Sequence, residues 1–151
     1  MIIIYHSEMA EWVSTCGSHI PDNAIRAGYE TDGKPLFIAR AIIQGAMTPG
    51  KCGIHLEGAY IPYGGKENLF QHYEVLVYPI NALGLLDWRQ ASNGEVPCNA
   101  VKTDNDLYVG RVLYSGSLIP CKIHTTHKVA YMGYYLKEHS SKDYEVLCKI
   151  I

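Results

Sequence analysis

The chain has 151 residues, a formal net charge of −2, and 48% hydrophobic and 19% charged residues. A chain of this length buries roughly two thirds of the surface that it exposes when unfolded, so it can fold without disulfides or metal ions. The high apolar content excludes a disordered chain, and the near-neutral charge argues against a surface built to bind polyanions.

Short segments rich in β-branched and aromatic residues predict strands, and turn sequences separate them. The predicted strands cover residues 36–43, 73–77, 107–114, 128–132 and 144–148. Turns are predicted at Asp32-Gly33, Thr48-Pro49-Gly50, Tyr63-Gly64-Gly65, Ser92-Asn93-Gly94 and Asp104-Asn105-Asp106. Because no segment of ten or more residues shows a convincing helical period, we expect an all-β fold of antiparallel strands.

The chain contains two copies of one pattern. Residues 36–76 and the segment 71 positions later share 14 of 41 aligned residues, where unrelated sequences would share roughly two or three. Upstream the spacing is 76, which pairs Trp12 with Trp88 and Asn23 with Asn99. The first copy therefore carries five extra residues, between about residues 27 and 31. We predict two tandem repeats related by pseudo-twofold symmetry, at residues 9–80 and 81–151, with residues 1–8 as an N-terminal extension.

The five cysteines are scattered, odd in number and never spaced as Cys-x-x-Cys, which predicts free thiols. The N-terminus has no basic region or cleavage site of a signal peptide, and no apolar stretch is long enough to span a membrane. These features predict a cytoplasmic protein, or one that is released by an unconventional route.

Three motifs suggest catalysis or cofactor binding, and each fails. Residues 45–52 are one residue short of a phosphate-binding loop, because Cys52 follows Lys51 where Ser or Thr is required; we expect a turn that presents the lysine. His124 and His127 lack further metal ligands nearby. Glu67 and Glu138 recur at the same place in both copies, which fits a structural role better than the unequal environments of a catalytic acid and base. We expect no enzyme, no cofactor and no metal.

The repeated pattern resembles the DM9 repeat family. The pattern covers nearly all of residues 9–151. In chain order it contains a Trp, the motif Pro-x-Asn-Ala, Asp-Gly, an aromatic strand that ends in Arg, Pro-Gly-Lys, Tyr-x-Pro-Tyr-Gly-Gly-Lys-Glu and Tyr-Glu-Val-Leu. Within the family the chain is most similar to the two-repeat, mannose-recognising lectins of bivalve molluscs. The resemblance implies a homodimer, metal-independent binding of mannose and high-mannose glycans, and a role in innate immune recognition.

The resemblance also implies the sugar ligands. They are an acidic residue after Gly28-Tyr29, which here is Glu30, and the lysine of Pro-Gly-Lys, which here is Lys51. The family residue at the first position is usually Asp, so mannose specificity is a weaker expectation than lectin function. A carboxylate and an ammonium can together bind the vicinal hydroxyls of a pyranose through charge-assisted hydrogen bonds.

The second copy lacks the Gly28-Tyr29-Glu30 segment but keeps Lys122. We therefore expect one competent site per chain, with Lys122 vestigial or auxiliary. The alternative is a non-catalytic intracellular interaction protein on the same scaffold, which the absent signal peptide and the free cysteines favour. A pore-forming protein would need a further membrane-inserting domain, and we do not expect that function for this chain.

Overall fold

The computed structural model describes residues 10–78 and 85–150, and every regular element in these ranges is a β-strand. The first repeat contributes β1 (Glu11–Cys16), β2 (Arg26–Tyr29), β3 (Pro35–Ile43), β4 (Ala46–Cys52), β5 (Ala59–Tyr63), β6 (Lys66–Phe70) and β7 (His72–Val77). The second contributes β8 (Leu86–Ser92), β9 (Lys102–Asp104), β10 (Leu107–Tyr114), β11 (Ser117–His124), β12 (Val129–Tyr134), β13 (Lys137–Ser141) and β14 (Asp143–Lys149). The predicted all-β, antiparallel fold is confirmed.

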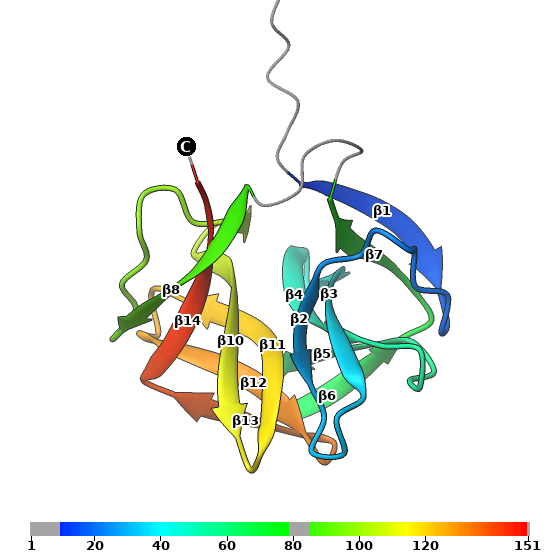
Figure 1. The fold of residues 1–151 in the computed structure, drawn as a ribbon. Helices are drawn as coiled ribbons and strands as arrows, with labels where there is room; N and C mark the ends of the chain where they lie inside the picture. Colours follow the sequence, from blue (N-terminus) through cyan, green and yellow to red (C-terminus); the bar gives the residue numbers. More distant parts are fainter. Residues whose placement is uncertain (1–9, 79–84, 151) are drawn as a thin grey trace, which may run out of the picture.

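The two repeats form the two halves of one sheet (Figure 1). Its strand order is β1-β7-β3-β4-β5-β6-β13-β12-β11-β10-β14-β8, which reads as the same order from either end and confirms the pseudo-twofold symmetry. The halves join at β6 and β13, through Lys66 and Lys137. The predicted boundary at residues 80 and 81 lies outside the described residues.

A second junction between the repeats is made by β2, which pairs with β3 of its own repeat and with β11 of the other. Tyr29 is opposite Leu118, and Ser117 Oγ donates a hydrogen bond to Tyr29 O at 2.8 Å. Gly28 permits this approach, because a Cβ built there would lie 1.9 Å from Leu118 O. The strands from β3 to β11 thus close into a ring through β2.

The repeated Pro-x-Asn-Ala motif ties the loop after the first strand of each repeat to the last strand. Asn23 Nδ2 donates to Tyr78 O at 2.7 Å, and Asn99 Nδ2 donates to Lys149 O at the equivalent place. The backbone bonds Tyr78 N to Asn23 O and Lys149 N to Asn99 O complete each pair. The motif is therefore a structural element of the repeat.

The hairpin turns use two left-handed residues, as type I′ turns require. Gln44 and Gly45 have φ of 50° and 80° between β3 and β4. The predicted turn at Thr48-Pro49-Gly50 is wrong, because these residues lie within β4. Proline cannot adopt a positive φ, and Gly50 is needed for close packing, since a Cβ there would lie 2.4 Å from Tyr60 O. Lys51, which was expected in a turn, is therefore a residue of β4, and Lys122 is a residue of β11.

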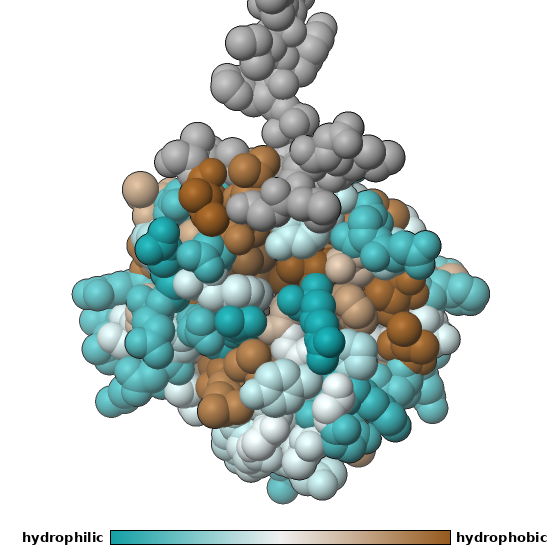
Figure 2. Space-filling view, in the orientation of Figure 1, coloured by the Kyte–Doolittle hydropathy of each residue, from teal (hydrophilic) through white to brown (hydrophobic). Residues whose placement is uncertain are grey.

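The buried apolar residues form three clusters, one within each repeat and one between them. The shared cluster combines Ile25, Ile38 and Leu76 of the first repeat with Val109 and Leu147 of the second. Each repeat thus contributes to a common core. On the face drawn in Figure 2, exposed apolar side chains occur in several separate groups among hydrophilic ones, which is typical of a protein surface. No helix in the described residues could cross a membrane.

All five cysteines lie in the described part of the chain, and none is in a disulfide. Cys16 and Cys98 are exposed, and the other three are buried. Burial raises the pKa of the Cys52 thiol to about 12 and also raises the pKa of Cys121 and Cys148. Because the thiolate is the reactive form, these buried thiols are inert in the folded protein.

We therefore expect two of the five thiols, Cys16 and Cys98, to react rapidly with a disulfide reagent in the native protein. All five should react in denaturant. Mass spectrometry after alkylation identifies the labelled positions. Rapid labelling of Cys52 or Cys121 without denaturant would contradict this arrangement.

Candidate functional site

Each repeat holds a buried lysine and a largely buried glutamate that form an ion pair. Lys51 Nζ in β4 lies 2.9 Å from Glu67 Oε1 in β6, and their side chains are only 8% and 5% exposed. The second repeat has the same pair, with Lys122 Nζ 3.3 Å from Glu138 Oε2. A solvated turn lysine would lie exposed at the surface, so these residues have a different role.

Both ion pairs contact the opposite repeat. Lys51 Nζ donates to Gly133 O at 3.0 Å, and Lys122 Nζ donates to Pro62 O at 2.6 Å. The carboxylates accept from backbone groups of the other repeat, Glu67 Oε2 from Leu136 N at 2.8 Å and Glu138 Oε1 from Gly65 N at 3.1 Å. We call each set of contacts an inter-repeat clamp: the first contains Lys51 and Glu67, and the second contains Lys122 and Glu138. The equivalent contacts of the two glutamates agree with the predicted structural role.

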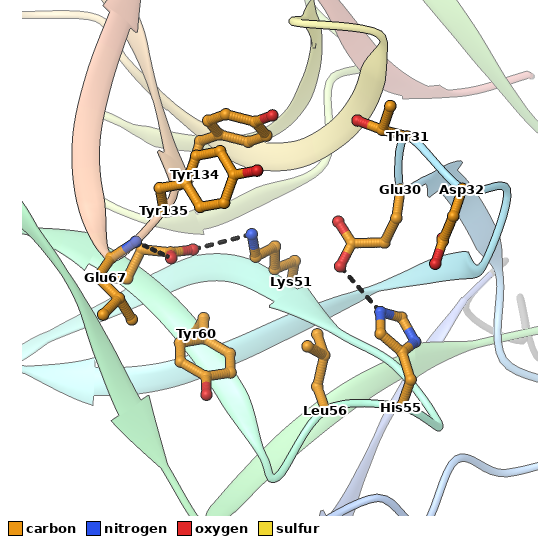
Figure 3. A pocket seen from close by; sticks show the side chains of 11 residues that line it. Glu30, Thr31, Asp32, Lys51, His55, Leu56, Tyr60, Glu67, Tyr134 and Tyr135 are labelled. Atoms are coloured by element: carbon orange, nitrogen blue, oxygen red, sulfur yellow. Dashed lines mark hydrogen bonds and ion pairs between the residues drawn. The ribbon is translucent and has the colours of Figure 1, made fainter.

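A surface pocket of about 410 Å³ lies at the first clamp. Its lining residues come from both repeats: Glu30, Thr31, Asp32, Lys51, His55, Leu56, Tyr60, Glu67, Tyr134, Tyr135 and Leu136. Figure 3 shows Lys51 near the centre, Glu67 on one side of it and Glu30 on the other. The structure thus brings the two predicted sugar ligands, Glu30 and Lys51, into one pocket.

Lys51 can still act on a ligand. An ammonium has three N–H donors; Lys51 Nζ donates one of them to Gly133 O, and Glu67 Oε1 lies 2.9 Å away as its ion-pair partner. Lys51 lines the pocket, so a bound ligand could reach its ammonium. The side chain is held from both repeats, so a ligand would not need to order it.

Glu30 follows the last residue of β2, at the start of a turn in which Glu30 N donates to Lys34 O at 2.8 Å. Its Oε2 lies 2.9 Å from His55 Nε2, and Figure 3 shows the carboxylate between His55 and Lys51. His55 therefore holds the side chain, which is longer than the aspartate expected from the family, and leaves the second carboxylate oxygen for a ligand.

Aromatic rings border the polar centre of the pocket. In Figure 3, Tyr134 and Tyr135 lie on one side of Lys51, and Tyr60 and Leu56 lie on the other. Burial, with a smaller effect of nearby Glu57 and Glu67, raises the pKa of Tyr60, so its hydroxyl stays neutral and can both donate and accept. This combination of apolar rings and a few convergent polar groups is typical of small-ligand sites.

The second clamp does not border this pocket, and Lys122 is not among its lining residues. Lys122 Nζ lies 5.1 Å from the Tyr63 ring centroid and 5.2 Å from that of Tyr131, so two rings flank the ammonium. Burial lowers the pKa of Lys122, although Glu138 opposes the shift. The two lysines thus have equivalent structural contacts and different surroundings.

The other sequence motifs lie away from this pocket. The His124 and His127 rings stack at 3.6 Å between centroids, and His127 Nδ1 lies 3.0 Å from the Tyr131 hydroxyl. Within residues 10–78 and 85–150, no group of three or more histidine, cysteine or acidic side chains is arranged to hold a metal. Glu74 and Glu145 pair with Arg40 and Arg111, whose guanidinium groups lie over Trp12 and Trp88.

The contribution of the second repeat to the pocket was not predicted from the sequence. Tyr134, Tyr135 and Leu136 lie more than 80 positions from Lys51 along the chain. A usable signal was present, because the turn that reads Gly64-Gly65 in the first copy reads Tyr135-Leu136 in the second. A turn that gives up both glycines at left-handed positions indicates a requirement for those side chains.

The fold and the pocket define a class: a two-repeat, all-β protein whose clamps join the halves beside a ligand-sized pocket. The chain belongs to the DM9 repeat family, whose profile, described as "DM9 repeat", matches residues 2–70, 43–106 and 102–150. The family resemblance noted from the sequence is therefore confirmed. Neither the family nor the names of the relatives described next indicate catalysis.

Several relatives are natterins of Thalassophryne nattereri. Natterin-4 is 32% identical over 137 residues, which cover 91% of this chain and 33% of the relative. Natterin-1 is 29% identical over 90% of this chain and 37% of its own length. The chain thus spans about a third of the length of these relatives.

Among solved structures, the nematode sperm cell motility protein MFP2B matches with a TM-score of 0.72 and 16% identity, over 100% of this chain and 49% of that one. This likeness shows the shared fold.

Proposed function

We propose that the chain is a carbohydrate-binding protein that recognises mannose or high-mannose glycans without a metal ion. The observation that carries the proposal is the meeting of Glu30 and Lys51 in one pocket of about 410 Å³ with aromatic walls. A pyranose presents hydroxyl groups along its edge and C–H groups on its faces. The carboxylate and the ammonium fit the hydroxyls, and the tyrosine rings fit an apolar face.

We propose one sugar site per chain. The acidic ligand lies in the segment that only the first repeat has, and Lys122 has no acidic partner corresponding to Glu30 in the second. A homodimer would then present two sites, and avidity would strengthen binding to clustered glycans on microbial surfaces, as an innate immune receptor requires. Within this proposal the protein is made in the cytosol and acts there or after unconventional release.

The decisive experiment compares Lys51→Ala with Lys122→Ala. Both variants lose the same kind of buried ion pair and inter-repeat hydrogen bond, so both lose stability to a similar extent. Only Lys51 borders the pocket. Calorimetry at low temperature, after circular dichroism shows that both variants are folded, should give no mannose binding for Lys51→Ala and near wild-type affinity for Lys122→Ala.

The Glu30→Gln variant tests the second ligand without disturbing a clamp. Loss of a charge-assisted hydrogen bond should weaken mannose binding by about tenfold or more. Binding of the wild type should survive EDTA. A stoichiometry of two equal sites per chain would contradict the single-site proposal. If the wild type binds no monosaccharide in a broad panel, the protein is better explained as a non-catalytic interaction protein on the same scaffold.

A further inference from the structure

The β12–β13 turn differs from its counterpart in the first repeat in side-chain chemistry, although both turns use two residues in the left-handed region. Tyr135 and Leu136 have φ of 49° and 65°, and the equivalent Gly64 and Gly65 have φ of 66° and 85°. Glycine adopts this left-handed region freely, whereas larger residues are strained there. The first repeat shows that the same turn closes without any side chain.

The backbone contacts of this turn do not need the side chains either. Leu136 N donates to Glu67 Oε2, and Leu136 O accepts from Glu67 N. Gly65 makes the corresponding two bonds to Glu138 in the other clamp. A glycine therefore supplies everything that the clamp uses.

Core packing does not account for the two side chains, because Tyr135 is 81% exposed and Leu136 is 67% exposed. The strain of the turn is thus not offset by buried apolar surface. Strained residues cluster at active sites and ligand-binding sites, and of the non-glycine residues with positive φ in the described chain only Tyr135 and Leu136 line this pocket.

The Tyr135 ring is held in place beside the pocket. It packs edge-on against the Tyr134 ring, with centroids 4.5 Å apart and an interplanar angle of 67°. Tyr134 in turn packs against Tyr114, at 5.2 Å. Both residues of the turn line the pocket, and Figure 3 shows the rings of Tyr134 and Tyr135 next to Lys51. The turn therefore extends the pocket outwards with a fixed aromatic surface.

We infer that the Tyr135–Leu136 turn is a second sugar subsite, which holds the next unit of an oligosaccharide whose terminal unit binds Glu30 and Lys51. The inference rests on the proposed function. An exposed ring can stack on the C–H face of a pyranose, and Leu136 adds apolar contact beside it. A second sugar is the occupant that fits, because Tyr135 and Leu136 line the same pocket as Glu30 and Lys51, so a unit linked to the first sugar can contact them.

The test uses the double variant Tyr135→Gly/Leu136→Gly, which gives the second repeat the turn of the first. Calorimetry measures the affinities for methyl mannoside and for mannobioses of different linkage. In the wild type, one mannobiose should bind about three- to tenfold more tightly than methyl mannoside. The variant should lose this ratio, because its affinity for the disaccharide falls further than that for the monosaccharide.

Two controls separate this role from a structural one. The variant should be at least as stable as the wild type, because glycine removes the strain. Leu113→Ala removes another exposed apolar side chain, 65% exposed and not part of this pocket, and should leave the ratio unchanged.

Several outcomes would overturn the inference. If the wild type binds methyl mannoside but no disaccharide more tightly, or if the variant keeps the ratio, the subsite is absent while the proposed function stands. If sedimentation shows that the variant only loses self-association, the turn binds a second copy of the chain instead. If the wild type binds no sugar, the proposed function and the subsite both fail.

Discussion

Replacing Glu67 with alanine should lower the free energy of unfolding by about 3–5 kcal/mol, a large part of the stability of a domain of this size. The change leaves the Lys51 ammonium, with a side chain 8% exposed, without its counter-charge. It also removes the acceptor of the Leu136 N–H across the repeat boundary. Loss of one partner of a buried ion pair is much more costly than the pair is favourable, because the remaining charge stays desolvated.

Urea unfolding followed by tryptophan fluorescence measures this effect in each repeat. Trp12 lies in β1 and Trp88 in β8, so Trp12→Phe and Trp88→Phe backgrounds each report on one half of the molecule. We expect coincident midpoints in both backgrounds, and an equal downward shift with Glu67→Ala, because the clamp joins the halves.

The matched control is Lys34→Ala, which breaks an ion pair with Asp32 whose side chains are 57% and 59% exposed. This change should lower the free energy of unfolding by less than about 0.5 kcal/mol. A loss below about 1 kcal/mol for Glu67→Ala, or midpoints that separate between the two tryptophan reporters in the wild type, would show that the clamps do not join the repeats energetically.

Gly28→Ala should lower the free energy of unfolding by about 3 kcal/mol, which is the upper end of the usual effect of one added methyl group in a packed interior. The added Cβ would lie 1.9 Å from Leu118 O and 3.3 Å from the Pro120 ring. The first of these is backbone of β11, so no side-chain rotation relieves the clash. β2 must move away from β11, which opens the ring and displaces Glu30, two residues later in the chain.

Gly33→Ala is the matched control for Gly28→Ala. Gly33 has φ of +89° and no atom within 4 Å of a built Cβ, so the change adds backbone strain without a clash. Gly33→Ala should lower the free energy of unfolding by about 1 kcal/mol. Hydrogen exchange should show faster exchange in β2 and β11 for Gly28→Ala alone. Similar losses for both variants would mean that strand separation at Gly28 is not the cause.

Much of the fold could be predicted from the sequence because its signals are local. Five strands and most turns follow from β-branched and aromatic runs between turn residues, and the repeat spacing indicates the symmetry. The turn at Thr48-Pro49-Gly50 was wrong for a physical reason. Proline and glycine often mark turns, but Gly50 is small because β5 packs closely against it, and the actual turn at Gln44-Gly45 has a weaker sequence signal.

The site was predictable only in part. The pair of Glu30 and Lys51 came from the family resemblance, and the structure places both in one pocket. The burial of Lys51 could not be foreseen, since it depends on Gly133 O and Glu67, one of which is 82 positions away. The aromatic wall from the second repeat was missed as well: the exchange of Gly64-Gly65 for Tyr135-Leu136 marks the turn as unusual, but nothing in the sequence places that turn beside Lys51.

The clamp contacts run in both directions between the two halves. Each repeat offers a lysine to the other and receives one in return, which is the reciprocal geometry of a symmetric dimer of single repeats. Once two such units are fused in one chain, symmetry no longer forces both half-sites to remain alike. The extra residues around Glu30 and the glycine-free turn at Tyr135 arise in different halves and border the same pocket. The two clamps can therefore share their structural contacts while only the first borders a pocket.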